Sequence, residues 1–311
     1  MGGDRRWRAD RQPTDGPAWR ASAGQDGRVS EQRRALVLGG GGVTGIAWTT
    51  GVLTGLADAG LDLTDADLVV GTSAGSIVGT QLRSGVPVAE LFDTEIAPPA
   101  PGPTARLGRR TLARYGLAML MARRDDAAFR RRVGALALAA ADAGATPSEE
   151  DWRQLIAVRL PGPDWPEQPL VLTAVDAQSG EFRTFDRDSG VDLLAAVAAS
   201  CAVPGVYPPV TVDGRRYIDG GMRSVANADL ATGCDRVVVI APIVRGVGPM
   251  AGVDAQVTGM VSRVAVVAPD QGSRTAIGKN VLDPAARPAS ARAGRAQAAA
   301  VAAEVAEAWQ G

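Results

Sequence analysis

The most informative absence in this 311-residue sequence is histidine, which occurs nowhere in the chain. Without an imidazole, a Ser-His-Asp triad cannot form, and a catalytic base must be a carboxylate, a lysine or a tyrosine. The two cysteines, Cys201 and Cys234, stand far apart in apolar segments and form no CxxC pattern. This spacing excludes the usual structural zinc site and predicts two buried thiols rather than a disulfide.

The sequence also lacks a strong charge of one sign and an unbroken apolar run. Its formal net charge is -1 and aromatic residues make up 4%, so no nucleic-acid partner is expected. The most apolar long stretch, residues 193–210, is interrupted by three prolines and does not predict a membrane span. Residues 1–33 are polar and have no apolar signal-peptide core, which predicts a disordered tail and a cytoplasmic location.

From residue 34 onwards, strand-like segments alternate with helical patterns. Strand-like segments stand at the start of residues 34–45 and 67–85. Further strand-like segments are 169–177, 181–186, 215–221 and 234–242. The alternation predicts one α/β domain over residues 34–311, with three α/β/α layers around a mostly parallel central sheet. Two regions are expected to add helices. They are an insertion at about 98–166, with a basic stretch at 105–134, and an Ala-rich C-terminal helix at about 289–309.

One strand-to-helix transition has the layout of a nucleophile elbow. Residues 71–75 read Gly-Thr-Ser-Ala-Gly, and the motif needs Gly71 and Gly75 because a Cβ beside Ser73 would clash in so sharp a turn. The free N–H groups at the start of the next helix would favour negative charge beside the serine. The alternative is an ordinary glycine-rich turn with an incidental serine.

A second glycine cluster, residues 39–45, also joins a strand-like segment to a helical one. Gly40, Gly42 and Gly45 fit the G-x-G-x-x-G pattern of a dinucleotide site, but the acidic residue expected about 20 positions later is missing. The second interpretation is an oxyanion hole that faces Ser73, because the carboxyl ends of parallel strands meet at one edge of a sheet. A glycine-rich turn without a role is the third.

The best-placed candidate base is Asp219, which follows a short strand and precedes Gly220 and Gly221. Aspartate is a weak base at its ordinary pKa of about 3.9, but burial would raise its proton affinity. The single lysine, Lys279, lies in a loop-like segment and is a weaker candidate. A plain Asp-Gly turn is the alternative. Asn227, shortly after this motif, is expected to brace the loop.

These three motifs together resemble those of the patatin-like phospholipases. Residues 39–45 resemble the glycine-rich oxyanion loop of that family, 71–75 its nucleophile elbow and 219–221 its aspartate motif, and the similarity covers roughly residues 34–242. The resemblance implies a Ser73–Asp219 catalytic dyad. It also implies oxyanion donors on the backbone of Gly40, Gly41 and Gly42, with Gly45, Gly71, Gly75, Gly220 and Gly221 supporting the motifs.

The resemblance further implies an enzyme that hydrolyses the carboxylic esters of lipids or other acyl esters, without a metal or organic cofactor. One departure is Thr44, where the family usually has Arg or Lys, and it weakens the expectation of a phosphate head-group preference. Peripheral membrane contact stays open, because the basic stretch 105–134 fits either a lid on anionic lipid or a solvated helix face. A nucleotide-binding protein and a lipid-binding family member without turnover also stay open.

Overall fold

The computed structural model describes residues 32–99, 105–106, 108–123 and 125–311. This part of the chain contains an eight-stranded sheet with the strand order β5-β6-β3-β2-β1-β7-β8, and β4 pairs with β3 beside that path. The strands are β1 (Arg34–Leu38), β2 (Leu68–Gly71), β3 (Leu170–Asp176), β4 (Phe182–Phe185), β5 (Val210–Val212), β6 (Arg215–Asp219), β7 (Arg236–Ile240) and β8 (Arg263–Val267).

The sheet is mixed, with a parallel centre. β1 pairs in parallel with β2 and β7, while β2–β3 and β7–β8 are also parallel. The pairs β3–β4, β3–β6 and β5–β6 are antiparallel. The predicted α/β fold with a mostly parallel central sheet is therefore confirmed, and the antiparallel strands lie together at one end.

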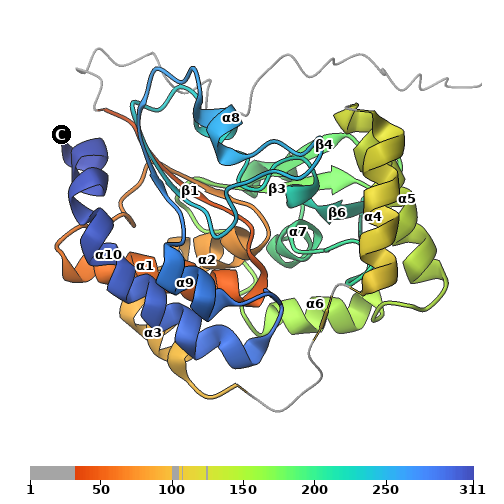
Figure 1. Ribbon diagram of the computed structural model, residues 1–311, viewed down its shortest axis with the longest axis horizontal. Coiled ribbons are helices and arrows are strands. Elements are labelled where there is room, and N and C mark those ends of the chain that lie inside the picture. Colours follow the sequence, from red (N-terminus) through yellow and green to blue (C-terminus); the bar gives the residue numbers. More distant parts are fainter. Residues whose placement is uncertain (1–31, 100–104, 107, 124) are drawn as a thin grey trace, which may run out of the picture. The chain divides into compact units, whose positions relative to one another are not determined.

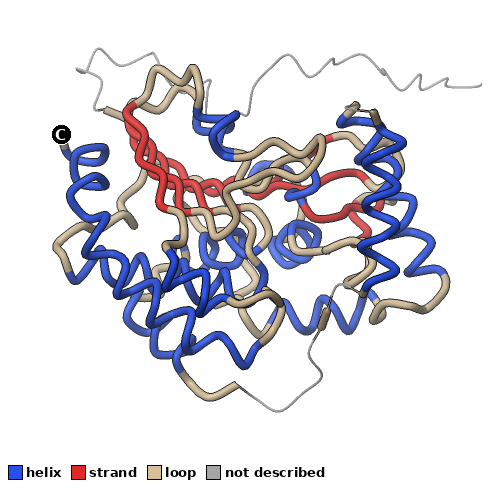
Figure 2. Tube along the Cα trace, viewed as in Figure 1, coloured by secondary structure: helices blue, strands red, loops and turns tan. Residues whose placement is uncertain are grey.

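The helices are α1 (Gly42–Asp58), α2 (Ala74–Arg83), α3 (Val88–Ile96), α4 (Arg109–Ala122), α5 (Asp126–Asp142), α6 (Glu149–Ala157), α7 (Leu193–Ser200), α8 (Val253–Val257), α9 (Gln271–Ile277) and α10 (Arg287–Gln310). Helices α1, α2 and α10 lie below the sheet in Figure 1, and Figure 2 shows the strands crossing between the helical layers. None of the helices in the described ranges has both the length and the apolar character needed to cross a membrane.

Alternate residues of β3 pack into two separate hydrophobic clusters. Leu172 and Ala174 belong to the large cluster that includes Trp48 and other residues of α1 and α2. Val175 belongs to the cluster on the other side, with Phe129 and Val133 of α5. Because both faces are covered, β3 is buried along its whole length and reads as a continuous apolar run.

Helices α4, α5 and α6 lie in the stretch where the sequence predicts a helical insertion, and α10 lies where it predicts a C-terminal helix. The predicted N-terminal tail falls, apart from residues 32 and 33, outside the described residues. Strand β8 and helices α8 and α9 were not predicted. Because β8 extends the parallel sheet beyond β7, it adds to the predicted fold without changing it.

Candidate active site

Ser73 lies in the turn between β2 and α2, in a backbone conformation that is rare for a residue with a side chain. Its φ is 53° and its ψ is -117°, so the turn holds local strain. The flanking glycines are required by close contacts. A Cβ on Gly75 would lie 2.0 Å from the Leu38 carbonyl oxygen, and one on Gly71 would lie 2.7 Å from the Cα of Ser76. The elbow geometry predicted for residues 71–75 is present.

The C-terminal end of α7 holds this strained turn in place. The Ser73 N–H donates to the Ser200 hydroxyl oxygen at 3.1 Å, and that oxygen lies 2.6 Å from the Ser76 hydroxyl. On its other side, the Cys201 thiol donates to the Ser73 carbonyl oxygen at 3.1 Å. Burial raises the pKa of Cys201 well above its ordinary value, so the thiol keeps the proton that it donates.

No role is predicted for Ser200 from the sequence, and Cys201 is expected only to be a buried thiol. Cys201 and Cys234 are both buried and neither is in a disulfide, which confirms that expectation. The contacts with Ser73 span more than 120 positions of sequence. No local pattern could have revealed them.

Asp219 ends β6, and the sheet carries it to Ser73 across 146 positions of sequence. β6 pairs with β3 and β3 pairs with β2, whose last residue, Gly71, stands two positions before the serine. Asp219 is 3% exposed, and the Ser73 hydroxyl lies close enough to its carboxylate to lower the pKa of Asp219. The structure therefore brings the two predicted dyad residues together.

Burial raises the pKa of Asp219 to about 6, while the hydrogen bonds from Ser73 and from the Gly221 N–H lower it. The Gly221 N–H lies 2.7 Å from Oδ1 of the carboxylate. The first glycine of this motif has no room for a side chain, because a Cβ on Gly220 would lie 2.2 Å from the Thr173 hydroxyl oxygen. A carboxyl with a pKa near neutrality is a suitable proton acceptor for a serine.

The glycine loop after β1 lies beside the serine, where a Cβ on Gly40 would be 3.5 Å from that of Ser73. The Gly40 N–H, however, donates to the Val225 carbonyl oxygen at 2.8 Å. It is therefore not free for a substrate oxygen, and the expectation that Gly40 is an oxyanion donor is not supported. For the N–H groups of Gly41 and Gly42, at the start of α1, no acceptor is found among the described residues.

Two supporting glycines and Thr44 fix the path of this loop. Gly42 has a φ of +61°, and a Cβ there would lie 2.6 Å from the Val281 carbonyl oxygen. Gly45 lies close to Pro242. Thr44 is fully buried, and both its N–H and its hydroxyl donate to the Val281 carbonyl oxygen. Thr44 thus holds the loop against the 281 segment and adds no charge to the site.

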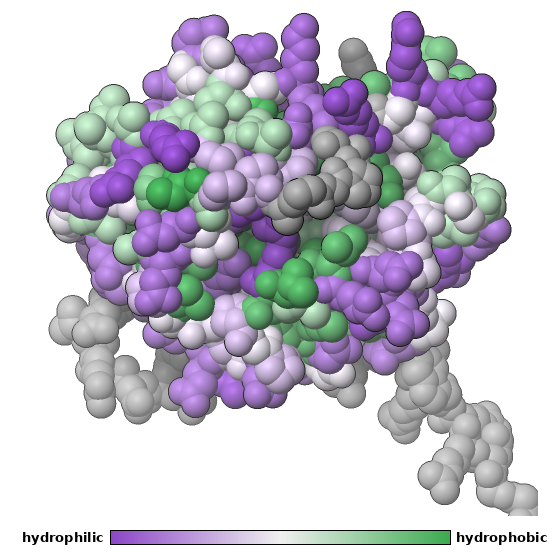
Figure 3. All heavy atoms as spheres, turned by 90° about the horizontal axis from the view of Figure 1, so that it is seen from below, coloured by the Kyte–Doolittle hydropathy of each residue, from purple (hydrophilic) through white to green (hydrophobic). Residues whose placement is uncertain are grey.

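Ser73 opens into a pocket of about 150 Å³ with mainly apolar walls. The pocket is lined by Gly42, Val43, Ile46, Ser73, Ala74, Ile77, Trp152, Leu155, Ile156, Arg159, Cys201, Val203, Tyr207 and Leu282. Leu155 of α6 is 53% exposed, so the pocket reaches the surface there. Figure 3 shows hydrophobic residues gathered near the middle of the face on which α6 lies. Arg159 is the one charged residue of the lining.

A buried polar network ties the turn before Ser73 to the loop after Asp219. The Asn227 amide nitrogen lies 3.0 Å from the Thr72 hydroxyl, 3.1 Å from the Ser224 carbonyl oxygen and 3.3 Å from that of Gly220. The Thr173 hydroxyl of β3 donates to that of Thr72 at 3.0 Å. The expectation that Asn227 braces the loop is confirmed, and the network also reaches the nucleophile elbow.

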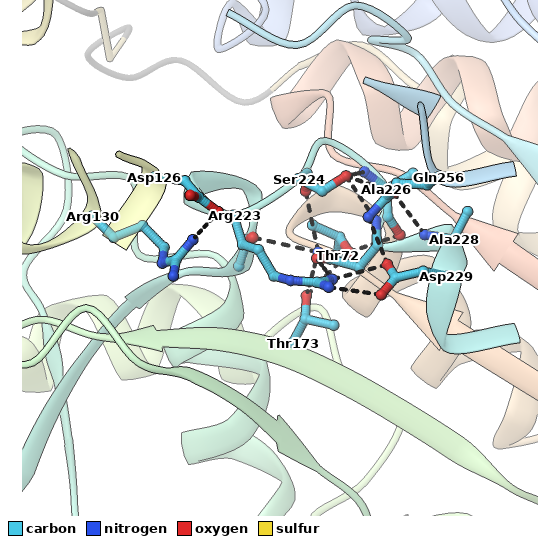
Figure 4. Close-up of polar contacts among 12 residues, drawn as sticks. Thr72, Asp126, Arg130, Thr173, Arg223, Ser224, Ala226, Ala228, Asp229 and Gln256 are labelled. Atoms are coloured by element: carbon cyan, nitrogen blue, oxygen red, sulfur yellow. Dashed lines mark hydrogen bonds and ion pairs between the residues drawn. The ribbon is translucent and has the colours of Figure 1, made fainter. Parts of the chain in front are cut away.

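Figure 4 shows how this network continues to the surface. The Arg223 guanidinium donates to the Asn227 side-chain oxygen at 2.9 Å and pairs with Asp229 at 2.6 Å. The side chain of Gln256 donates to Asp229 and accepts from Ser224. Because each buried polar group in this set has a partner, the relative position of the two catalytic loops is fixed from both sides.

Comparison with known proteins identifies the family. The family model described as patatin-like phospholipase matches residues 36–232, and the chain belongs to this family. The match contains both predicted glycine motifs and the aspartate motif.

Among curated proteins, the chain is 32% identical over 195 residues to uncharacterized NTE family proteins of Mycobacterium tuberculosis and Mycobacterium bovis. The aligned region is 62% of this chain and 44% of those relatives. Among solved structures, VipD from Legionella pneumophila matches 88% of this chain and 67% of its own, with 12% identity and a TM-score of 0.43. The type III effector ExoU matches 90% and 54%, with 17% identity and a TM-score of 0.40.

Proposed function

We propose that this protein is a serine acyl hydrolase that cleaves carboxylic ester bonds of lipids. The observation that carries the proposal is the closeness of the Ser73 hydroxyl to the buried carboxylate of Asp219 at an apolar pocket. Membership of the patatin-like phospholipase family supports the same chemistry. Because the chain contains no histidine, the carboxylate is the group in contact with the serine that can take its proton.

In the first step, the Ser73 hydroxyl oxygen attacks the ester carbonyl carbon while Asp219 accepts the hydroxyl proton. The negative charge that develops on the carbonyl oxygen is met by the N–H groups of Gly41 and Gly42. One such donor contributes about 3 kcal/mol of barrier lowering. The positive end of α2, which begins at Ala74, favours the same charge.

In the second step, the alcohol leaves with the proton from Asp219, and an acyl group remains on Ser73. The carboxylate then accepts a proton from a water molecule, which attacks the acyl carbonyl. The bond to Ser73 Oγ breaks, Asp219 returns the proton to that oxygen, and the fatty acid is released. The apolar walls of the pocket, formed by residues such as Ile46, Ile77 and Leu282, suit a hydrocarbon chain. Thr44 is turned into the protein, so the cation that the described lining offers a polar head group is Arg159, which also forms an ion pair with Glu95 at 3.8 Å.

A fluorophosphonate probe tests the proposal, because it reacts covalently with an activated serine. We expect labelling and ester hydrolysis in the wild type. Both should be lost in Ser73→Ala, with at least a 1000-fold fall in kcat/KM, on the order seen when a nucleophile is removed. The matched control is Ser84→Ala, which removes an exposed hydroxyl directly after the C-terminal end of α2 and should keep labelling.

Labelling that persists in Ser73→Ala would overturn the assignment of the nucleophile. The alternative is a family member that binds lipid without turnover. It would be favoured if the wild type bound fatty acid or lipid in the pocket but neither reacted with the probe nor hydrolysed any ester. Probe labelling alone, lost in Ser73→Ala, would already exclude that interpretation.

A further inference from the structure

We propose that the exposed face of α4 docks on an anionic lipid surface. The helix is unusual among those described in how much apolar surface it leaves uncovered. Leu112, Leu117, Leu120 and Met121 are each more than half exposed. Of its residues, only Ala118 and Ala122 are buried. Such a group of exposed large apolar side chains on one helix marks a contact surface.

Arginines are interleaved with these apolar residues. Arg109, Arg110 and Arg114 lie on the helix, and Arg123 directly follows it. None of the four forms an ion pair within the described ranges, and α4 itself carries no acidic residue. Several other arginines are paired with carboxylates, as in Arg153–Glu149, Arg216–Asp142 and Arg295–Asp58. The cations of α4 are therefore available to an outside partner.

The opposite face of α4 places this surface beside the proposed active site. The Tyr115 hydroxyl donates to the Pro204 carbonyl oxygen at 2.7 Å. Burial raises the pKa of Tyr115, and the nearby Asp219 charge adds to the rise. Met119 packs beside Gly248. A lipid surface that contacts the outer face of α4 would thus lie one helix away from the carboxylate of the dyad.

Charge and polarity together favour lipid over a protein partner. Cations and large apolar residues share one helix face, and this composition lets the apolar side chains enter the acyl region while the guanidinium groups meet lipid phosphates. The net charge of the chain is only -1, so attraction to an anionic surface would have to come from this local patch. The occupant to which we commit is the anionic leaflet of a membrane.

Sedimentation of the full chain with lipid vesicles tests this proposal. Two vesicle types are compared, phosphatidylcholine alone and phosphatidylcholine mixed with phosphatidylglycerol. All binding measurements use the Ser73→Ala variant as the parent protein, because a variant that does not hydrolyse lipid leaves the vesicle composition unchanged. We expect binding to the mixed vesicles and little to the neutral ones. Replacing Arg109, Arg110 and Arg114 with Gln should lower the partition coefficient about 100-fold, since each arginine near an anionic surface contributes about fivefold.

The matched control replaces three exposed arginines elsewhere, Arg187, Arg274 and Arg292, with Gln and should bind like the parent protein. Equal loss in both triple variants, or equal binding to both vesicle types, would overturn the proposal. The proposal would also be overturned if the protein hydrolysed soluble esters but bound neither type of vesicle. That result would point to a protein partner for the α4 surface.

The docking surface deepens the proposed function, and the two can fail separately. Vesicle binding that depends on the α4 arginines, in a protein whose wild type hydrolyses no ester, would refute the hydrolase and leave docking supported. If the docking surface and the hydrolase are both right, the α4 triple variant should lose vesicle binding. In an otherwise wild-type protein, the same three replacements should leave the hydrolysis of soluble esters unchanged.

Discussion

Helix α2 begins directly after Ser73, and α4 contacts the Pro204 segment through Tyr115, but the two helices differ in how far they bury their side chains. All of the residues of α2 except Gln81 are buried, and even its Arg83 guanidinium is held by the Ala66 carbonyl oxygen and Gln168. Helix α4 buries two alanines and leaves its leucines exposed, and its arginines form no ion pair with the residues that the structure describes. The contrast separates two tasks: one helix fixes the position of Ser73, and the other offers a surface to something outside the chain.

The largest expected effect is on the pH dependence of activity, and it comes from the buried carboxylate of Asp219 beside Ser73. Because the pKa of Asp219 is raised to about 6, a dyad that needs the ionised carboxylate should lose activity below that pH. We expect kcat/KM to fall about tenfold per pH unit, and thus about 100-fold at pH 4. A pH profile of initial rates on a soluble ester measures this, and a rate that stays constant down to pH 4 would contradict the role of Asp219.

The same raised pKa makes Asp219 a cost to stability above neutrality. Its folded pKa of about 6 exceeds an unfolded value of about 3.9, so the fold favours the protonated form. This stabilisation is complete below about pH 4 and is lost as the pH rises through 6. Asp219→Asn, which is always neutral, should therefore be inactive yet more stable than the wild type at pH 8, by on the order of 3 kcal/mol.

Denaturant unfolding at two pH values checks the stability of Asp219→Asn. The gain should disappear at pH 4, where the wild-type carboxyl is also neutral. Asp164→Asn, at an exposed position, provides the control and should change stability little at either pH. A variant that is less stable than the wild type at pH 8 would show that the hydrogen bonds of the carboxylate outweigh its burial.

The next expected effect comes from breaking the network that joins the two catalytic loops. Asn227→Ala removes an amide that contacts Thr72, Ser224 and Gly220, and it places alanine at a φ of 53°. We expect a loss of about 2–3 kcal/mol in the free energy of unfolding, since buried partners are left unpaired. Activity should fall together with stability, because Ser73 and Asp219 are held by this group.

Asn280→Ala is a suitable comparison for Asn227→Ala. Its side chain bonds the Ala105 carbonyl oxygen and the Leu282 N–H in a half-buried loop. Its cost should stay below about 1 kcal/mol. Equal costs for the two variants would mean that the buried network contributes no more than an ordinary loop contact.

Features that depend on local sequence could be predicted, whereas contacts between distant segments could not. Gly71, Gly75 and Gly220 could be recognised because each stands next to a catalytic candidate and has no space for a Cβ. Local spacing carries that kind of signal. The buried strands could be predicted as well, since sheet strands covered on both faces are continuously apolar.

The parts that escaped prediction depend on contacts between distant segments. Ser200 and Thr173 look like ordinary polar residues in apolar stretches, and only the fold brings them to Ser73 and Thr72. The sequence also could not show that the Gly40 N–H is already used by Val225, because a glycine motif does not state which of its amides remain free. Asn227 was predicted to brace the loop after Asp219, but its contact with Thr72 could not be predicted from the sequence.

The smallest expected effect lies on the exposed side. Leu120 of α4 is 75% exposed, so Leu120→Ser should change the free energy of unfolding by no more than about 0.5 kcal/mol. Leu172→Ala, in the buried centre of β3, should instead cost about 2–5 kcal/mol. Urea denaturation of both variants measures the difference. If Leu120→Ser costs more than about 1 kcal/mol, its side chain is packed within the protein and the α4 face is not free to dock.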